Sequence, residues 1–499
     1  MARRHKQGIG RAQEALLPPR VEDYVSETSV VRAIDAYVDT LELEALGFNH
    51  TTGDLAPGQP AFDPALLLKR YLYGDLNRVR SSRRLERESQ RNLELIWLLE
   101  GLVPSYRTIA EIRRVDGNAL RAANRDFVVR CQELEIVGGE PIGIDGSFFK
   151  ASASDASITT RKSLEAALKQ IARDLEAYTQ DLDANDAQEE QTGDGLGEDP
   201  ELARKLDQLK ARQQAQLERL EANGETQFSR TDPDARALTK GKQHVTGDNV
   251  QNCVDDKHKL IVHHDVTNAG NDQNQLSGQC REAMAVLEVE MVTAVADGGY
   301  YREAELAACE AAGVTVYIPI PDKHRAVTGQ GRLSGKRFQY NQTHNVYICP
   351  AGEVLPPRGQ PQHKNGVWRT GYSRPAGQCR DCPLTVVCLP DSGAARRIYR
   401  SEHAQVVAAH QQRMAEQGPE NMRQRAGLVE HPFGTLKRWL GWDHFLVRGF
   451  RKVRGEMSLM VLGYNLLRVI NQLGVGAFRD YCARRAAARN AQALAQRAG

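Results

Sequence analysis

Long apolar runs are missing from this sequence of 499 residues. A helix that spans a membrane needs roughly 18 consecutive apolar residues, and no segment approaches that length. The basic start at Arg3, Arg4 and Lys6 is not followed by an apolar segment, so we do not expect a signal peptide. These absences predict a cytoplasmic protein that has no membrane partner.

The chain also has almost no net charge, because 66 basic residues face 64 acidic ones and leave a formal charge of +2. The distribution is uneven, however. Residues 161–228 contain 9 basic and 16 acidic side chains, whereas residues 400–499 contain 16 basic and 7 acidic ones. A polyanion responds to the local charge and not to the total. The basic C-terminal region is therefore a candidate surface for nucleic acid.

The sequence contains only nine cysteines, and this small, odd number does not favour a disulfide scaffold. Four cysteines lie in one part of the chain. They are Cys349, the C-x2-C pair Cys379 and Cys382, and Cys388, which follows this pair after five further residues. Four thiolates suit tetrahedral Zn²⁺, and a closed site of this kind is structural. Reduced thiols without a metal are the alternative, and the remaining five cysteines are typical of small core residues.

A short apolar run bounded by Gly and Pro contains one acid, Asp145, within Ile142–Phe149. Such a run predicts a buried β-strand. A carboxylate in a buried strand costs several kcal/mol unless it is paired or bound to a metal. Asp-Gly is also a common turn dipeptide, so this stretch alone does not decide between a turn and a functional acid.

Two further stretches supply partners for this acid. Met291–Ala296 is a predicted buried strand that ends in Asp297, and Glu430 precedes Lys437 by seven residues, about two helical turns. Carboxylates that are brought together repel unless cations lie between them, and oxygen ligands suit Mg²⁺ or Mn²⁺. Two such ions activate a water or a 3′-hydroxyl in phosphodiester chemistry. Lys437 would then contact a phosphate.

Three stretches, 143–150, 295–300 and 429–437, resemble the catalytic motifs of DDE transposases of bacterial insertion sequences. The likeness is to the IS4/IS5-like superfamily and most of all to the IS1182 family. Residues 62–114, with Tyr-Leu-Tyr-Gly at 71–74 and Ser-Ser-Arg-Arg-Leu-Glu at 81–86, are similar to the helical N-terminal domain of these enzymes. The motifs occur in the family's order over most of the chain.

This resemblance implies an α/β protein with an RNase H-like catalytic core, in which helices flank a mixed sheet. It also implies that Asp145, Asp297 and Glu430 are the catalytic acids and that they hold two Mg²⁺ or Mn²⁺ ions. The family's arginine would stand four residues before the glutamate, where this chain has Ala426. Arg423 and Arg425 lie nearby, so the position of the arginine stays open. Competing third acids are Glu456, Asp232 and Asp234.

The predicted organisation has an all-helical N-terminal domain, an inserted helical hairpin and a cysteine-rich insertion around the core. Its parts are a flexible arm (1–20), a helical domain for DNA binding or dimerisation (21–137), the core (138–160 and 229–320), the hairpin (161–228), the cysteine-rich insertion (321–400), core helices with the third acid (401–475) and a basic tail (476–499). The predicted DNA contacts are Lys437, Arg438, Arg425, Arg423, Trp439, Arg448 and Lys452. Basic side chains bind phosphates and aromatic ones stack on bases, although a solvated face with core tryptophans is the alternative.

The function implied is a transposase that binds double-stranded DNA as a homodimer or larger synaptic assembly. It would cleave at the terminal inverted repeats of its element and join the ends to target DNA. Three alternatives remain open at this point: a catalytically idle DNA-binding relative, a general RNase H-like metal nuclease, and a zinc-dependent regulator.

Overall fold

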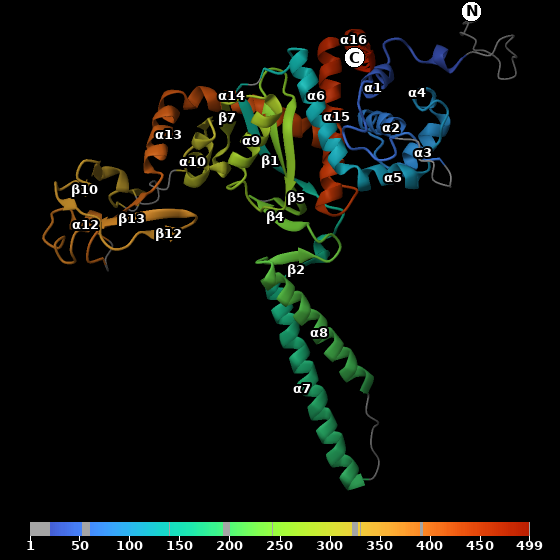
Figure 1. Ribbon diagram of the computed structural model, residues 1–499. Coiled ribbons are helices and arrows are strands. Elements are labelled where there is room, and N and C mark those ends of the chain that lie inside the picture. Colours follow the sequence, from blue (N-terminus) through green and yellow to red (C-terminus); the bar gives the residue numbers. More distant parts are fainter. Residues whose placement is uncertain are drawn as a thin grey trace, which may run out of the picture. The chain divides into compact units, whose positions relative to one another are not determined.

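The computed structural model describes residues 20–51, 60–138, 140–192, 200–241, 243–321, 328–329, 331–389 and 393–498. The chain divides into two compact units (Figure 1). The first contains Met1–Asp126 and Ser458–Gly499, and the second contains Phe127–Met457. All but the last residue of the predicted N-terminal arm lies outside the described residues. Within the described residues, no helix is long and apolar enough to cross a membrane.

The first unit is helical throughout its described parts. Its elements are η1 (Val21–Tyr24), α1 (Val30–Asp39), α2 (Pro64–Leu76), α3 (Ser82–Arg91), α4 (Leu93–Leu98), α5 (Tyr106–Val115), the start of α6 (Gly117–Glu133), the end of α15 (Phe450–Leu473) and α16 (Val475–Ala498). Asp63 caps the start of helix α2, because its carboxylate accepts a hydrogen bond from Ala65 N at 2.8 Å. Pro64 occupies the first turn, where a missing N–H costs nothing.

Residues 458–499 group with the N-terminal helices, whereas the predicted division assigned them to the core and to a tail. The reason lies in their contacts. Asn124 Nδ2 donates to Ser458 O at 2.6 Å, and the ring of Phe478 lies 6.5 Å from that of Tyr37 on α1. Both rings are buried. The basic C-terminal segment is thus a helix with one apolar face packed on α1.

The second unit is built around a mixed sheet whose central strand is β1. Its strands are β1 (Ile142–Lys150), β4 (Arg236–Lys240), β5 (Gln243–Asp255), β6 (Ile261–Thr267), β7 (Val292–Ala296) and β8 (Val314–Tyr317). Strand β5 pairs antiparallel with β1, and β4 and β6 pair antiparallel with different halves of β5. On the other side of β1, strands β7 and β8 run parallel to it. The predicted mixed sheet flanked by helices is confirmed.

Helix α9 (Leu276–Leu287) connects β6 to β7, and helix α10 (Glu303–Ala311) connects β7 to β8. Both helices share one hydrophobic core with the sheet. That core contains Ile142 and Ile144 of β1, together with Cys253, Cys280 and Cys309, which are fully buried as expected. Helix α14 (Gly418–Gly434) packs closely on β1 at Gly143. A methyl group at Gly143 would lie 2.5 Å from Leu428 and 2.7 Å from Val429. This close approach fixes the helix that carries the predicted third acid.

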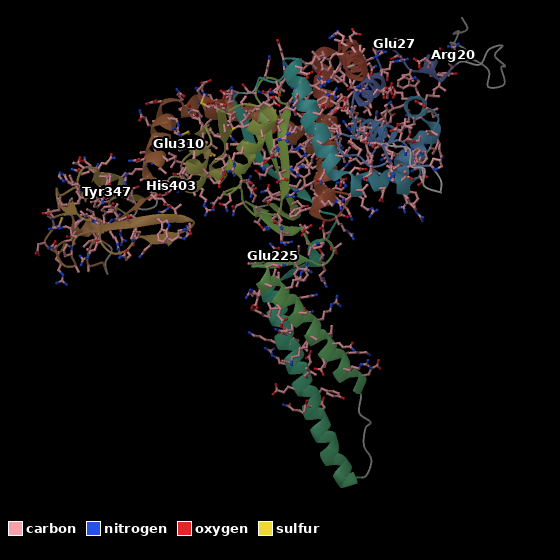
Figure 2. All side chains as sticks on the ribbon, in the orientation of Figure 1. Arg20, Glu27, Glu225, Glu310, Tyr347 and His403 are labelled. Atoms are coloured by element: carbon pink, nitrogen blue, oxygen red, sulfur yellow. The ribbon has the colours of Figure 1, made fainter. Side chains whose placement is uncertain are left out.

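The inserted hairpin consists of α7 (Arg161–Thr192) and α8 (Pro200–Ala222), which stand on the short strands β2 (Ile158–Thr160) and β3 (Gln227–Ser229) (Figure 1). Leu164, Leu220 and Phe228 form a small core at its base, near the ion pair of Glu225 with Arg236 (Figure 2). Residues 181–192 contain no Gly or Pro and are rich in Ala, Gln and Glu, so α7 continues to Thr192.

The cysteine-rich segment forms two small antiparallel sheets. One sheet contains β9 (Gln339–Asn341), β10 (Val346–Ile348) and β11 (Val354–Leu355), and the other contains β12 (Gln362–Lys364), β13 (Val367–Ser373) and β14 (Arg397–Ser401). Most of these strands are two or three residues long and too short to show alternation. The short helix α12 (Thr385–Cys388) follows the C-x2-C pair, and α13 (Ala404–Glu416) leads to α14.

Candidate active site

Asp145 lies in the middle of β1, with its side chain 19% exposed. It is paired with Asn252 across the antiparallel side of the sheet, so the segment is a strand and not a turn. Burial raises the pKa of the Asp145 carboxyl to about 6, although the charges of Arg425 and Lys240 oppose this shift. A half-buried acid of this kind is most stable next to a cation.

Asp297 follows β7 directly and caps the turn Gly298–Tyr300, because its Oδ1 accepts a hydrogen bond from Gly299 N at 2.8 Å. Strand β7 runs parallel to β1, with Ala296 opposite Ile144. Asp145 directly follows Ile144, and Asp297 directly follows Ala296. The parallel pairing therefore brings Asp145 and Asp297 to the same end of β7.

Arg425 on α14 contacts both acids. Its Nη2 lies 3.6 Å from Asp145 Oδ1 and 3.9 Å from Asp297 Oδ2. The guanidinium is 20% exposed, so this ion pair is partly shielded from solvent. Arg425 was predicted as a DNA contact, and the structure places it against the acids. Of the two arginines near Ala426, Arg425 is the one that contacts both acids, whereas Arg423 pairs with Glu420.

Glu430 lies on the exposed side of α14, five residues after Arg425. Its neighbour Val429 is buried against Gly143 on β1, which anchors this part of the helix at the sheet. In the described part of the chain, no three His, Cys, Asp or Glu side chains are arranged as they would be around a metal ion. The structure thus gathers Asp145 and Asp297 with Arg425, and it does not bring Glu430 into a ligand group with them.

Lys437 lies in a π-helical turn, Thr435–Trp439, that continues from α14. Its Nζ donates to Ser147 Oγ at 2.6 Å and to Phe148 O, both on β1, and lies 4.5 Å from the Phe149 ring. Burial lowers the pKa of Lys437 to about 8, while the charges of Asp443 and Asp145 favour the ammonium form. The lysine therefore points to the strand that carries Asp145.

The predicted helix around Glu430 and Lys437 has a different form. Pro432 lies inside α14 and not in its first turn, since the helix begins at Gly418. After Pro432 the helix contains a π-helical turn, in which one turn takes more residues than in an α-helix. Glu430 and Lys437, seven residues apart, therefore no longer lie on one face. Glu430 is accordingly exposed, whereas Lys437 is partly buried.

The other predicted DNA contacts have varied surroundings. Arg438 is exposed, as is Trp439 at 52%, whereas the neighbouring Trp442 and Phe445 are core residues. Arg423 forms an exposed ion pair with Glu420 at 3.1 Å, Arg448 donates to Ser152 O at 2.9 Å, and Lys452 is half-buried.

The competing acids have contacts that explain them structurally. Glu456 is buried and accepts hydrogen bonds from Leu446 N and Val447 N at 2.9 and 3.2 Å. Asp232 and Asp234 accept hydrogen bonds from Gly449 N and Phe450 N, at the start of α15. Carboxylates at these positions satisfy backbone donors that a helix start leaves unpaired.

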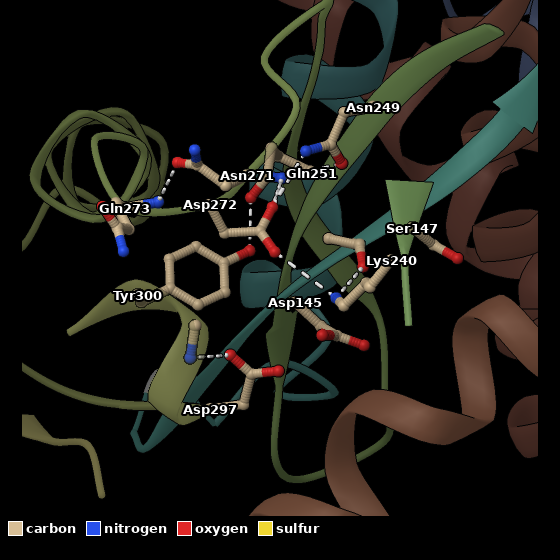
Figure 3. Close-up of polar contacts among 12 residues, drawn as sticks. Asp145, Ser147, Lys240, Asn249, Gln251, Asn271, Asp272, Gln273, Asp297 and Tyr300 are labelled. Atoms are coloured by element: carbon tan, nitrogen blue, oxygen red, sulfur yellow. Dashed lines mark hydrogen bonds and ion pairs between the residues drawn. The ribbon is translucent and has the colours of Figure 1, made fainter. Parts of the chain in front are cut away.

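A polar cluster next to the two aspartates was not predicted (Figure 3). It contains Asp272, Asn249, Gln251, Tyr300 and Lys240, which come from four separate segments. Asp272 lies in a run of polar residues between β6 and α9, a sequence typical of a solvated loop. No local pattern marks it, because its burial depends on the folded sheet.

The four predicted zinc ligands, Cys349, Cys379, Cys382 and Cys388, line one small cavity of about 30 Å³. The short α12 supports this arrangement, since Cys388 N donates to Leu384 O at 2.9 Å. Burial raises the pKa of the Cys388 thiol, and the other three cysteines raise it further, so the four sulfurs are close enough to influence one another. In the described structure they are nevertheless not arranged as ligands around a common point.

Two family matches cover opposite ends of the chain. Residues 19–115 match a transposase domain (DUF772), and residues 348–470 match a transposase DDE domain. The second match contains Glu430 and Lys437, whereas Asp145 and Asp297 precede it. Both matched families are transposase domains. The two matches support a DDE transposase of the insertion-sequence type, as the resemblance implied.

Two further comparisons add little. No curated protein matches the chain. Among solved structures, the chain is similar to piggyBac transposase in a synaptic complex with hairpin DNA, at 9% identity and a TM-score of 0.30. That alignment covers 92% of this chain and 76% of the other.

Proposed function

We propose that this transposase cleaves DNA at the ends of its element and transfers the ends to target DNA, in a metal-dependent reaction. The observation that carries the proposal is the position of Asp145 and Asp297 at one edge of the sheet, held together by the cation of Arg425. Two half-buried carboxylates that share a cation form a site suited to a divalent metal.

The core is proposed to be RNase H-like. If β1 is taken as the first strand and β5, β6 and β7 as the next three, Asp145 stands on the first strand and Asp297 follows the fourth. This is the placement that the family resemblance implies. The N-terminal match is compatible with the IS1182 family in particular.

Asp145, Asp297 and Glu430 would hold Mg²⁺ or Mn²⁺, because all three offer oxygen atoms and none offers a softer ligand. Such ions, when bound, activate the attacking oxygen and stabilise the leaving one. Glu430 has to turn from solvent towards the edge of the sheet to take part. Arg425, once released from the two acids, is positioned to bind a phosphate oxygen.

The chemistry is an in-line displacement at phosphorus. In cleavage a water oxygen bonds to phosphorus and loses a proton, while the bond from phosphorus to the 3′-oxygen breaks and that oxygen gains a proton to become a 3′-hydroxyl. In strand transfer that 3′-hydroxyl loses its proton as it attacks a target phosphate, and the displaced 3′-oxygen of the target strand takes up a proton. Lys437, anchored on Ser147 and Phe148, supplies positive charge next to Asp145 in both steps.

The DNA partner is proposed to be the double-stranded terminal repeats and the target. Exposed Arg438 and Trp439 follow Lys437 directly and would contact the backbone or a base. A synaptic assembly of at least two chains follows from the need to hold two ends. We also propose structural Zn²⁺ at the four cysteines, whose thiols would turn towards a common point within their cavity.

The decisive experiment compares the wild type with Asp145→Asn, Asp297→Asn and Glu430→Gln on labelled duplexes carrying the element's ends, with and without Mg²⁺. We expect metal-dependent cleavage and joining by the wild type, background levels from each variant, and unchanged binding to the ends. Full activity in all three variants would overturn the proposal. Binding without cleavage by the wild type would favour an idle relative, and cleavage independent of the end sequence would favour a general nuclease.

A further inference from the structure

Asp272 is a buried carboxylate beside the two catalytic aspartates that the proposed chemistry does not use. Its side chain is only 6% exposed. Its Oδ1 accepts hydrogen bonds from Asn249 Nδ2 at 2.9 Å and from Gln251 Nε2 at 2.8 Å (Figure 3). A buried charge that receives several donors is held in a single orientation. Asp272 is therefore a fixed point of negative charge.

Asp272 is connected by hydrogen bonds to the turn that follows Asp297. The Tyr300 hydroxyl donates to Gln251 Oε1, which leaves the Gln251 amide nitrogen directed at Asp272. Tyr300 itself is fully buried and ends the turn that Asp297 caps. The orientation of Asp272 thus depends on residues of β5 and of the catalytic turn together.

Asp272 is not itself placed as a metal ligand. The neighbour of Asp145 on β1 is Gly146, and a methyl group there would lie 2.5 Å from Asp272 Oδ1. Successive side chains of a strand point to opposite faces, so Asp272 lies against the face of β1 opposite to the Asp145 side chain. Its Oδ1 already accepts two amide donors, and its Oδ2 faces the ammonium group of Lys240.

Lys240 links Asp272 to the proposed catalytic site, because it contacts Asp272 and its charge acts on Asp145. It is the last residue of β4, and its Nζ lies 3.4 Å from Asp272 Oδ2 and 3.4 Å from Gly146 O. Its side chain is still 48% exposed. Its positive charge lowers the pKa of Asp145 and that of Lys437.

A lysine ammonium has three donors, and the two contacts of Lys240 are long. It can therefore bind a further acceptor from the solvent side without leaving Asp272. Together with Arg425 and Lys437, it completes a set of three cations from three different segments around the two aspartates. Such a set suits a polyanion whose scissile phosphate lies at the acids.

We propose that Lys240 binds a phosphate of the DNA strand held at the Asp145–Asp297 edge, and that Asp272 is the positioning residue that keeps its ammonium group there. This inference rests on the proposed function, since it concerns the same site. A free lysine side chain loses much rotamer entropy when it binds, and a fixed carboxylate beneath it removes part of that cost.

The test uses Lys240→Gln, Lys240→Arg, Asp272→Asn and the double variant Asp272→Asn/Lys240→Gln in the full chain. Asp272→Asn keeps an oxygen for the two amide donors but places an NH₂ group towards Lys240, so it removes the anchor alone. The readouts are end binding as a function of salt, and the rate of Mg²⁺-dependent cleavage. Lys169→Gln, at an exposed site on α7, is the matched control.

We expect Lys240→Gln to weaken binding by about tenfold and to lower the salt slope by about one. Lys240→Arg should restore most of both, and Asp272→Asn should fall between Lys240→Gln and the wild type. The double variant should equal Lys240→Gln, because Asp272 acts through Lys240. An unchanged salt slope in Lys240→Gln would overturn the phosphate contact. Additive losses in the double variant would overturn the positioning role.

The two proposals fail differently. If the wild type shows no metal-dependent cleavage, the proposed function fails, while the salt slope of Lys240→Gln still decides the phosphate contact. If the wild type cleaves and Lys240→Gln behaves like Lys169→Gln, only the inference about Lys240 is wrong.

Discussion

Arg425 Nη2 lies 3.6 Å from Asp145 Oδ1, on a helix that the chain reaches 280 residues later. This cation offsets the repulsion between the two aspartates. In the proposed metal-dependent reaction a divalent ion held by the same oxygens would displace it, so the arginine and the metal would compete for these oxygens.

We therefore expect Arg425→Ala to bind Mn²⁺ several-fold more tightly than the wild type, and to cleave DNA at least about tenfold more slowly, because a cation on the reacting phosphate is lost. Calorimetric titration with Mn²⁺ and a single-turnover cleavage assay would measure the two effects. Arg425→Lys keeps the charge and should show smaller changes. Equal Mn²⁺ affinity in Arg425→Ala and wild type would contradict the competition.

Asp145 and Asp297 could be picked out from the sequence because their signals are local. Asp145 interrupts a buried apolar run, Asp297 ends another, and parallel strands bring such positions to one edge. The contact of Arg425 was not predictable, since it depends on the phase of α14 and on the close packing at Gly143. Asp272 was missed for a related reason: its neighbours in the sequence are polar, and only the folded sheet buries it.

The position of α14 depends on Gly143, and this can be tested with a pair of glycine variants. Gly143→Ala forces a methyl group to within 2.5–2.7 Å of Leu428 and Val429, so α14 must shift. We expect a loss of about 1–3 kcal/mol in the free energy of unfolding together with a loss of cleavage. Gly427→Ala, on the same helix but with open space around it, should instead stabilise the protein by about 0.5–1 kcal/mol. Destabilisation by both would mean that packing at β1 is not the cause.

Thermal stability can distinguish a catalytic third acid from a carboxylate that has only a structural role. Glu456 accepts two backbone hydrogen bonds in a buried site, so Glu456→Gln should lower the melting temperature markedly. Glu430 is exposed, so Glu430→Gln should leave the melting temperature unchanged and remove cleavage. Thermal unfolding and cleavage assays on both variants make the comparison. A folded, active Glu430→Gln protein would assign the third acid elsewhere.

Removal of zinc offers a test of the cysteine cluster. If Cys349, Cys379, Cys382 and Cys388 bind the metal, the purified protein should contain one zinc ion per chain, and a chelator should lower its melting temperature. Cys382→Ser should lose the zinc, whereas Cys131→Ser, far from the cluster in sequence, should retain it. Elemental analysis gives the zinc content. Metal-free wild type that melts at the same temperature with and without chelator would show that these thiols are simply reduced.

The last prediction concerns Asp248, a carboxylate that is only 1% exposed and whose two oxygens have no hydrogen-bond partner among the described residues. Burial raises its pKa to about 7, and the charges of Asp232 and Asp234 raise it further, while Arg236 opposes them. An acid whose pKa is raised by folding keeps its proton in the folded chain at pH values at which the unfolded chain has already lost it. Between about pH 4 and pH 7 the free energy of unfolding should therefore fall by about 1.4 kcal/mol per pH unit on account of this group, and level off above pH 7.

Asp248→Asn removes this titration, because an amide keeps the shape of the protonated acid and cannot ionise. We expect the variant to match the wild type near pH 4 and to exceed it in stability at pH 8, with the difference growing through the interval between. Thermal unfolding across this pH range measures the difference. Parallel stability curves for the two proteins would contradict a proton held at Asp248, and a variant less stable at every pH would show that the carboxyl group makes contacts which an amide cannot replace.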